Sequence, residues 1–149
     1  MKIGIANDHR GYELKCKIMK ILKNKGYEIE DFGTDSSESV DYPDYGKKVA
    51  ERVSNNKLDR GIVICGSGIG MSIIANKFPK VRAALCYKPI IAKMTRKHNN
   101  SNVLVLAADY IEQEKLIETL NNFFNTKFDG GRHKRRIDKI RDIEKKLME

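Results

Sequence analysis

The sequence predicts one α/β domain built on a doubly wound, five-stranded parallel sheet. Short apolar segments alternate with helical patterns along the 149 residues, as in sheets whose strands are connected by helices. The segment GIVIC, residues 61–65, is a continuous apolar run typical of a parallel strand covered on both faces. The length suits a single domain with a full core. We expect right-handed crossovers and a flavodoxin-like strand order, 2-1-3-4-5.

The predicted strands are short apolar runs between turn signals. They cover residues 3–7, 27–32, 61–65, 81–87 and 103–106. The predicted helices repeat apolar residues with a period of 3.6 and cover residues 14–22, 44–54, 68–77, 89–97 and 111–124. Gly26 closes the first helix, and Pro89 stands in the first turn of the fourth. Gly130 and Gly131 precede a basic C-terminal helix within residues 131–149.

Much of the net charge of +9 lies in this last helix, which raises the question of nucleic-acid binding. The same helix carries apolar residues at helical spacing: Ile137, Ile140, Ile143 and Leu147. Such a stripe is expected to dock on another protein surface, which a disordered basic arm would not need. The patterned charge therefore argues against a nucleic-acid partner.

The N-terminus begins with a strand-like run rather than a signal peptide, and no apolar run approaches the roughly 18 residues of a membrane span. Three cysteines, Cys16, Cys65 and Cys86, are an odd number at no metal-ligand spacing. We therefore expect a reduced, cytoplasmic compartment, no membrane partner and no metal site.

Chemically active residues follow two of the predicted strands. In a doubly wound sheet, ligands bind at the carboxyl ends of the strands where the strand order reverses, here between strands one and three. Asp8 and His9 follow the first strand, and the run from Cys65 to Gly70 follows the third. The sequence therefore predicts a binding site at this place.

The run VICGSGIG, residues 63–70, has several possible roles. It lacks the lysine of a phosphate-binding P-loop, and no dinucleotide fingerprint follows the first strand, so nucleotide binding is poorly supported. The loop leads into a helix N-terminus whose free N–H groups can hold an anion. Cys65 would there have a lowered pKa and could serve as a general base. Alternatively, Cys65 is a small apolar residue that ends a buried strand.

Other polar residues allow similar alternatives. His9 beside Asp8 is a common acid–base pairing, whereas a lone His98 is usually a surface or capping residue. Arg132 and Arg136 are four residues apart on one helical face, where they could grip a phosphate together or simply be solvated.

Several motifs together resemble those of ribose-5-phosphate isomerase type B and the related galactose-6-phosphate isomerase subunits. They are DHRGYELK, DFGTDSSESVDYPDYG, GIVICGSGIGMSIIANK, VRAAL, RKHNNSNVL and FDGGRHKRRIDKI, in order and at the usual spacings over nearly the whole chain. The resemblance implies an aldose–ketose isomerase of carbohydrate metabolism, in the pentose phosphate pathway, without metal or organic cofactor. It also implies a homodimer, or a tetramer of two such dimers, with active sites shared between subunits. The C-terminal helix would dock on the partner subunit.

The resemblance also implies roles for individual residues. Cys65 would move a proton between C1 and C2 of the sugar, and Ser67 would assist proton transfer at the sugar oxygens. Asp8 and His98 would open the furanose ring. The remaining residues would bind the enediolate, the sugar or the phosphate: the amides of Gly66, Gly68, Ile69 and Gly70 for the enediolate, Asn99 and Tyr42 for the sugar, and His9, Arg132, Arg136 and His133 for the phosphate.

One position departs from the family pattern. Relatives usually have an arginine in a GxR motif after strand five, where this chain has Asp109. A carboxylate beside a phosphate is repulsive by about 1 kcal/mol or more at close range. Asp109 would therefore turn away, weaken phosphate binding or accompany a different substrate. Ribose 5-phosphate is the expected substrate, with a six-carbon sugar phosphate such as allose 6-phosphate or galactose 6-phosphate as the alternative. A non-catalytic sugar-phosphate-binding module is a further alternative.

Overall fold

Five parallel strands form the middle layer of the structure, a computed structural model that describes residues 1–149. They are β1 (Lys2–Asn7), β2 (Glu28–Asp31), β3 (Arg60–Cys65), β4 (Ala83–Leu85) and β5 (Val103–Ala107). Every neighbouring pair is parallel, which confirms the predicted sheet. The strand order reverses between β1 and β3, as expected, because β2 lies beyond β1 and β5 lies beyond β3.

The predicted order of the last two strands is wrong. The sheet runs β2-β1-β3-β5-β4, so that β5 pairs with both β3 and β4, and β4 takes the edge. All five residues of β5 are fully buried, whereas the three residues of β4 are only half-buried. An apolar strand buries the most surface when it lies in the centre of a sheet that helices cover on both faces. A short strand is suited to the edge.

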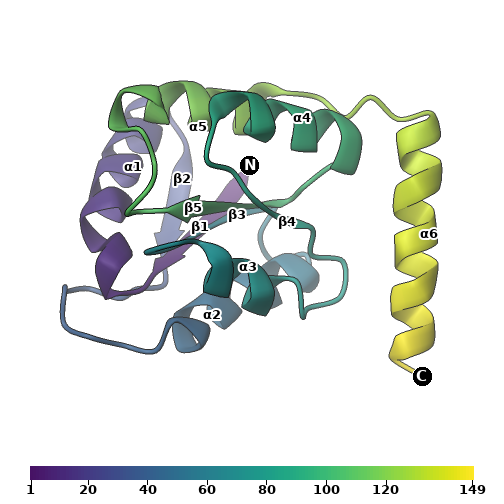
Figure 1. Ribbon diagram of the computed structural model, residues 1–149, viewed down its shortest axis with the longest axis horizontal. Coiled ribbons are helices and arrows are strands. Elements are labelled where there is room, and N and C mark those ends of the chain that lie inside the picture. The colour runs from purple at the N-terminus through teal and green to yellow at the C-terminus, as the bar shows by residue number, and fades with distance from the viewer.

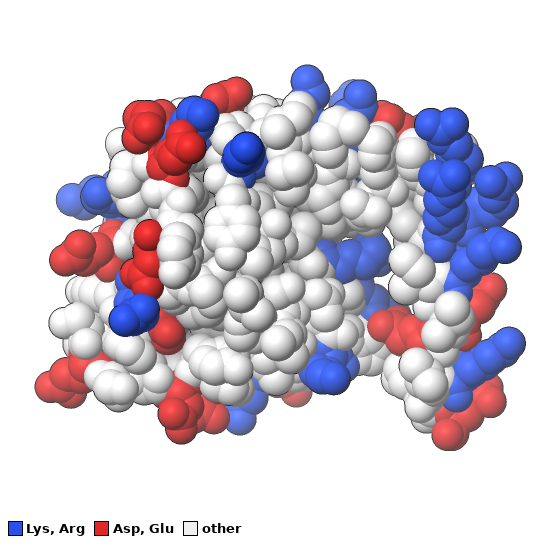
Figure 2. All heavy atoms as spheres, viewed as in Figure 1, with Lys and Arg blue, Asp and Glu red and all other residues white.

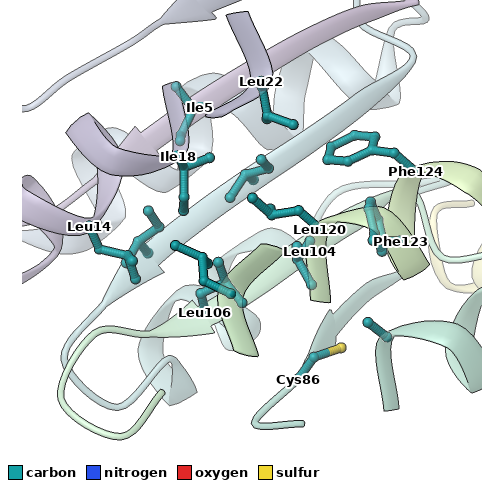
Figure 3. Close-up of a cluster of buried hydrophobic side chains, with 14 of the residues drawn as sticks. Ile5, Leu14, Ile18, Leu22, Cys86, Leu104, Leu106, Leu120, Phe123 and Phe124 are labelled. Carbon is teal, nitrogen blue, oxygen red and sulfur yellow. The ribbon is translucent and has the colours of Figure 1, made fainter. Parts of the chain in front are cut away.

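Helices cover both faces of the sheet (Figure 1). On one face lie α1 (Tyr12–Asn24), α4 (Pro89–Asn99) and α5 (Leu116–Asn125), and on the other lie α2 (Tyr42–Ser54) and α3 (Ile69–Ala75). Figure 3 shows the first of two buried clusters, in which Ile5 and Leu104 of the sheet meet Ile18 of α1 and Leu120 of α5. A second cluster under α2 and α3 includes Cys65. Two 3-10 turns, η1 (His9–Gly11) and η2 (Gln113–Lys115), precede α1 and α5.

The C-terminal helix α6 (Arg132–Leu147) forms as predicted but stands apart from the sheet domain (Figure 1). None of its residues is buried, and Ile140, Ile143 and Leu147 of the predicted stripe are each more than half exposed. A groove of about 560 Å³ separates the helix from the body of the domain. The apolar stripe is therefore uncovered within a single chain. None of the helices combines the length and apolar character that a membrane span requires.

Gly68 and Gly26 allow a matched test of how the loop after β3 is held. Both have positive φ angles, 76° and 87°. A Cβ at Gly68 would lie 2.4 Å from Leu85 Cδ1, whereas a Cβ at Gly26 would meet nothing within 4 Å. We expect Gly26→Ala to lower the free energy of unfolding by about 1–2 kcal/mol, the cost of the left-handed backbone alone. Gly68→Ala should cost roughly 2–5 kcal/mol, because it adds overpacking against Leu85. Urea denaturation measures both free energies of unfolding. Equal losses for the two variants would show that Leu85 moves aside to accommodate the added methyl group at Gly68.

Candidate active site

The loops that follow β1, β3 and β5 leave the sheet at one edge. Asn7 pairs with Ile64, and Cys65 pairs with Ala107, so the residues after these positions are neighbours. The loop after β5 is tied to the loop after β3, because the Asp109 N–H donates to the Gly66 carbonyl at 3.0 Å. The structure thus brings the residues after the first, third and fifth strands together at the predicted place.

The Cys65 thiol lies at the start of α3, surrounded by backbone amides. The N–H groups of Met71, Gly68 and Gly70 hydrogen-bond to it. The loop can curl around the sulfur because Gly68 adopts a left-handed conformation directly before α3. Cys65 itself is only 6% exposed. The arrangement provides a ring of donors around the end of β3, suited to an anion on the thiol or beside it.

The expected lowering of the Cys65 pKa is wrong for the single chain. Burial raises the pKa of this thiol above its ordinary value, and the negative charge of Asp8 raises it further. The hydrogen bonds from Met71, Gly68 and Gly70 act in the opposite direction but do not outweigh burial. The sequence pattern indicated the helix N-terminus correctly, but it could not show how deeply the end of β3 is covered.

Asp8 and His9 are held by backbone groups. Asp8 is buried, and its Oδ1 accepts hydrogen bonds from the N–H groups of Arg10 (3.0 Å) and Gly11 (3.1 Å), so it caps η1. Nδ1 of His9 accepts a hydrogen bond from the Val40 N–H at 3.2 Å. This contact assigns the proton of a neutral His9 to Nε2, which can then donate to an anion.

Tyr42 and Ser67 also lie at the loop. A Cβ at Gly70 would be 2.5 Å from Tyr42 Cε1, so the ring of Tyr42 rests directly against Gly70. The Ser67 Oγ accepts a hydrogen bond from the Ile69 N–H at 3.2 Å, and its carbonyl accepts one from the Tyr87 hydroxyl at 2.9 Å. The half-buried hydroxyl of Ser67 is therefore fixed beside the amide ring around Cys65.

Arg10 is a residue of this edge that the sequence analysis missed. Its Nη1 donates to Asp109 Oδ2 at 2.5 Å. The two side chains meet over Gly66, where a Cβ would lie 2.8 Å from Arg10 Cδ and 2.8 Å from Asp109 Oδ2. Asp109 therefore does not face the loop as an unpaired charge. A signal was present, since Arg10 directly follows Asp8 and His9, but only the strand order shows that it reaches the loop after β5.

The remaining predicted residues gather elsewhere. His98 and Asn99 end α4, and the ring of His98 stacks on that of His133 with centroids 4.2 Å apart. Arg132 and Arg136 are exposed on the first turns of α6. Partial desolvation and the nearby His98 and arginines lower the pKa of His133, which keeps its imidazole neutral over more of the pH range.

These two groups of residues lie at opposite ends of the sheet. His98 and Asn99 come just before β5 begins at Val103, whereas Cys65 pairs with Ala107 at the end of β5. At about 3.3 Å per residue, the strand alone separates them by roughly 13 Å. We call the residues around Cys65 the thiol half-site and those around His98 the histidine half-site. One chain does not join the two.

The histidine half-site also contains a possible set of metal ligands. Ligand atoms of His98, Asp129 and His133 lie within 4.8 Å of one another. However, Asp129 already faces the Lys97 ammonium at 3.9 Å, and Arg132 and Arg136 add positive charge that depresses the pKa of His133. A cluster with this many cationic neighbours suits an anion better than a metal cation.

Comparisons with known proteins show the family to which the chain belongs. The family model for ribose/galactose isomerases matches residues 3–140. Ribose-5-phosphate isomerase B of Escherichia coli is 40% identical over 145 residues, which cover 97% of each chain. A structure of the Clostridium thermocellum ribose-5-phosphate isomerase B superposes with a TM-score of 0.96 at 50% identity, covering 99% of each chain.

A further similar structure carries a sugar phosphate. It is ribose-5-phosphate isomerase B of Mycoplasma genitalium with bound ribulose 5-phosphate, at 41% identity and a TM-score of 0.93, covering 97% of this chain and 96% of that one. The family model covers most of the chain, and the relatives match nearly their whole length. The protein is a member of the ribose/galactose isomerase family.

Proposed function

We propose that this isomerase interconverts ribose 5-phosphate and ribulose 5-phosphate, without a metal or organic cofactor, by proton transfer from and to Cys65. The observation that carries the proposal is the Cys65 thiol at the point where the strand order reverses, with three backbone amides directed at it. The similarity of this chain to a relative with bound ribulose 5-phosphate supports the choice of substrate.

The proposed reaction needs a base, an enediolate site and a proton relay. Cys65 as thiolate takes the proton from C2 of the open-chain aldose and returns it to C1. The amides of the loop from Gly66 to Gly70 stabilise the enediolate oxygen that forms in between. Ser67 carries a proton between the oxygens on C1 and C2. Cys65 must first lose its proton, which burial opposes and the amide ring favours.

The other proposed roles concern the ring and the phosphate. Asp8 and His98 open the furanose, while Tyr42 and Asn99 contact the sugar. The phosphate is bound by a group of cationic and imidazole side chains: His9, His133, Arg132 and Arg136. His9 fits this role because its Nδ1 accepts from the Val40 N–H, which leaves the proton on Nε2 to donate to an anion.

A shared site follows from the separation of the two half-sites. A substrate can meet Cys65 and His98 together only if the second comes from another subunit, so we propose a homodimer. Large exposed apolar residues support this: Ile69, Ile73, Tyr87, Ile90, Ile91 and Tyr110. Figure 2 shows a broad uncharged area in the middle of one face, where α3 and α4 lie in the same view of Figure 1. α6, with its uncovered stripe, would dock on the partner.

Turnover of a panel of sugar phosphates, measured with EDTA present, tests the proposed substrate. We expect kcat/KM for ribose 5-phosphate to exceed those for allose 6-phosphate and galactose 6-phosphate by about tenfold or more, because an extra carbon must be fitted between fixed half-sites. A preference for a six-carbon substrate would replace ribose 5-phosphate but keep the chemistry. No turnover of any sugar phosphate by folded dimer, together with salt-sensitive nucleic-acid binding, would favour a binding module instead.

A further inference from the structure

The pair formed by Arg10 and Asp109 lies over the loop after β3. Arg10 comes from η1, directly after His9, and Asp109 comes from the loop after β5. Their side chains cross β3 to meet over Gly66, the residue that follows the thiol. Because Gly66 is the residue after the thiol, the pair lies close to the amide ring around Cys65.

The pair is poorly placed to stabilise the fold. The Arg10 side chain is 61% exposed and that of Asp109 is 40% exposed. An ion pair exposed to this degree contributes little to the stability of the fold, because water screens the charges. Its position over Gly66 is therefore better explained by what it does to a ligand than by what it does to the fold.

Most of the hydrogen-bonding capacity of Arg10 is unused. A guanidinium has five N–H donors in a planar fork, and in Arg10 the only contact is the one from Nη1 to Asp109. The backbone N–H of Arg10 is fixed by Asp8 Oδ1, so the side chain starts from a rigid point. The remaining N–H groups can donate to two oxygens of a phosphate side by side, the geometry in which arginine binds phosphate best.

From this placement we propose that Arg10 binds the phosphate group of the substrate and that Asp109 positions the guanidinium over Gly66. The inference rests on the proposed function, because it takes a sugar phosphate as the ligand. His9, whose Nε2–H is free to donate, precedes Arg10 in the same turn, so the two residues would grip the phosphate from one side. Asp109 orients Arg10 through the hydrogen bond and also repels the phosphate through its charge.

The opposite effects of the two side chains provide the test. Binding of inorganic phosphate to the full-length protein is measured by titration calorimetry, which needs no turnover. Arg10→Ala should weaken phosphate binding by at least about tenfold, because a single charge-assisted hydrogen bond is already worth that much. Arg10→Lys should recover only part of this, since it keeps the charge but loses the fork. Asp109→Asn should strengthen phosphate binding by several fold, because the amide oxygen still accepts from Arg10 while the repulsive charge is gone.

Lys20→Ala is the matched control. It removes one positive charge from an exposed site on α1 and should leave phosphate binding unchanged. If Arg10→Ala binds phosphate as well as the unmodified protein, or if Asp109→Asn weakens binding as Arg10→Ala does, the pair is structural and the proposal is wrong. If turnover of ribose 5-phosphate fails but these opposite shifts appear, the phosphate site stands and only the proposed substrate falls.

Discussion

Replacing Cys65 by alanine should lower kcat for ribose 5-phosphate by roughly two to four orders of magnitude, the usual contribution of a positioned base. The sulfur is the side-chain atom to which the backbone amides of Met71, Gly68 and Gly70 hydrogen-bond at the end of β3. Removing it leaves the ring, Ser67 and the side chains proposed to bind the phosphate in place. Substrate binding should therefore change little, and the loss should appear in kcat rather than in KM.

Two further cysteines supply the controls for this variant. Cys16 is exposed on α1, and Cys16→Ala should retain full turnover. Cys86 is fully buried, and burial raises its pKa to about 12, so its thiol stays protonated and inert at working pH. If Cys65→Ala retains more than about a tenth of the original kcat while binding substrate normally, the base is another group.

The pH dependence of alkylation gives an independent view of the same thiol. Because burial raises the pKa of Cys65, its thiolate should be scarce at neutral pH and should increase as pH rises. Alkylation of Cys65 by iodoacetamide, followed by mass spectrometry, should accelerate up to an apparent pKa at or above the ordinary value of about 8.5. An apparent pKa well below this value would show that a partner subunit supplies positive charge to the thiol.

The sequence predicts the sheet and the place of the site better than it predicts distances within the site. The run GIVIC, the glycine turn and the Asp8–His9 pair are local patterns, and each was found at the expected edge. The predicted order of β4 and β5 was wrong. What distinguishes the two strands is that VLVLA is fully buried and AAL only partly buried, and this depends on tertiary packing. The spacing of residues in the sequence could not reveal that burial raises the pKa of Cys65. Nor could it reveal that Arg10 meets Asp109 beyond the end of β3.

The separation of the half-sites has a comparable origin. His98 and Cys65 belong to motifs that both resemble those of one family, and the sequence gives no reason to place them at opposite ends of the sheet. The reason lies in the direction of α4, which begins after the carboxyl end of β4 and returns the chain to the amino end of β5. Any residue in its last turn is therefore far from the loop after β3.

A mixed dimer of two inactive chains should recover activity. A Cys65→Ala chain and an Arg132→Ala chain are co-expressed with different affinity tags, and the heterodimer is purified through both. If each site takes its thiol half-site from one chain and its histidine half-site from the other, one site carries both defects and the second carries none. The heterodimer should then show about half of the unmodified turnover per dimer, as two-fold symmetry requires. Each homodimer should stay nearly inactive when assayed below KM.

The matching negative control uses two defects from the same half-site. His98→Gln and Arg132→Ala both affect the histidine half-site, so every site of their heterodimer carries one defect, and turnover should stay low. Recovery in the first heterodimer and not in the second is the pattern that only a shared site produces. If neither heterodimer recovers activity, the complete site belongs to one chain. Since 13 Å or so of strand separates Cys65 from His98, such a result would require α4 to move relative to the sheet before substrate could be turned over.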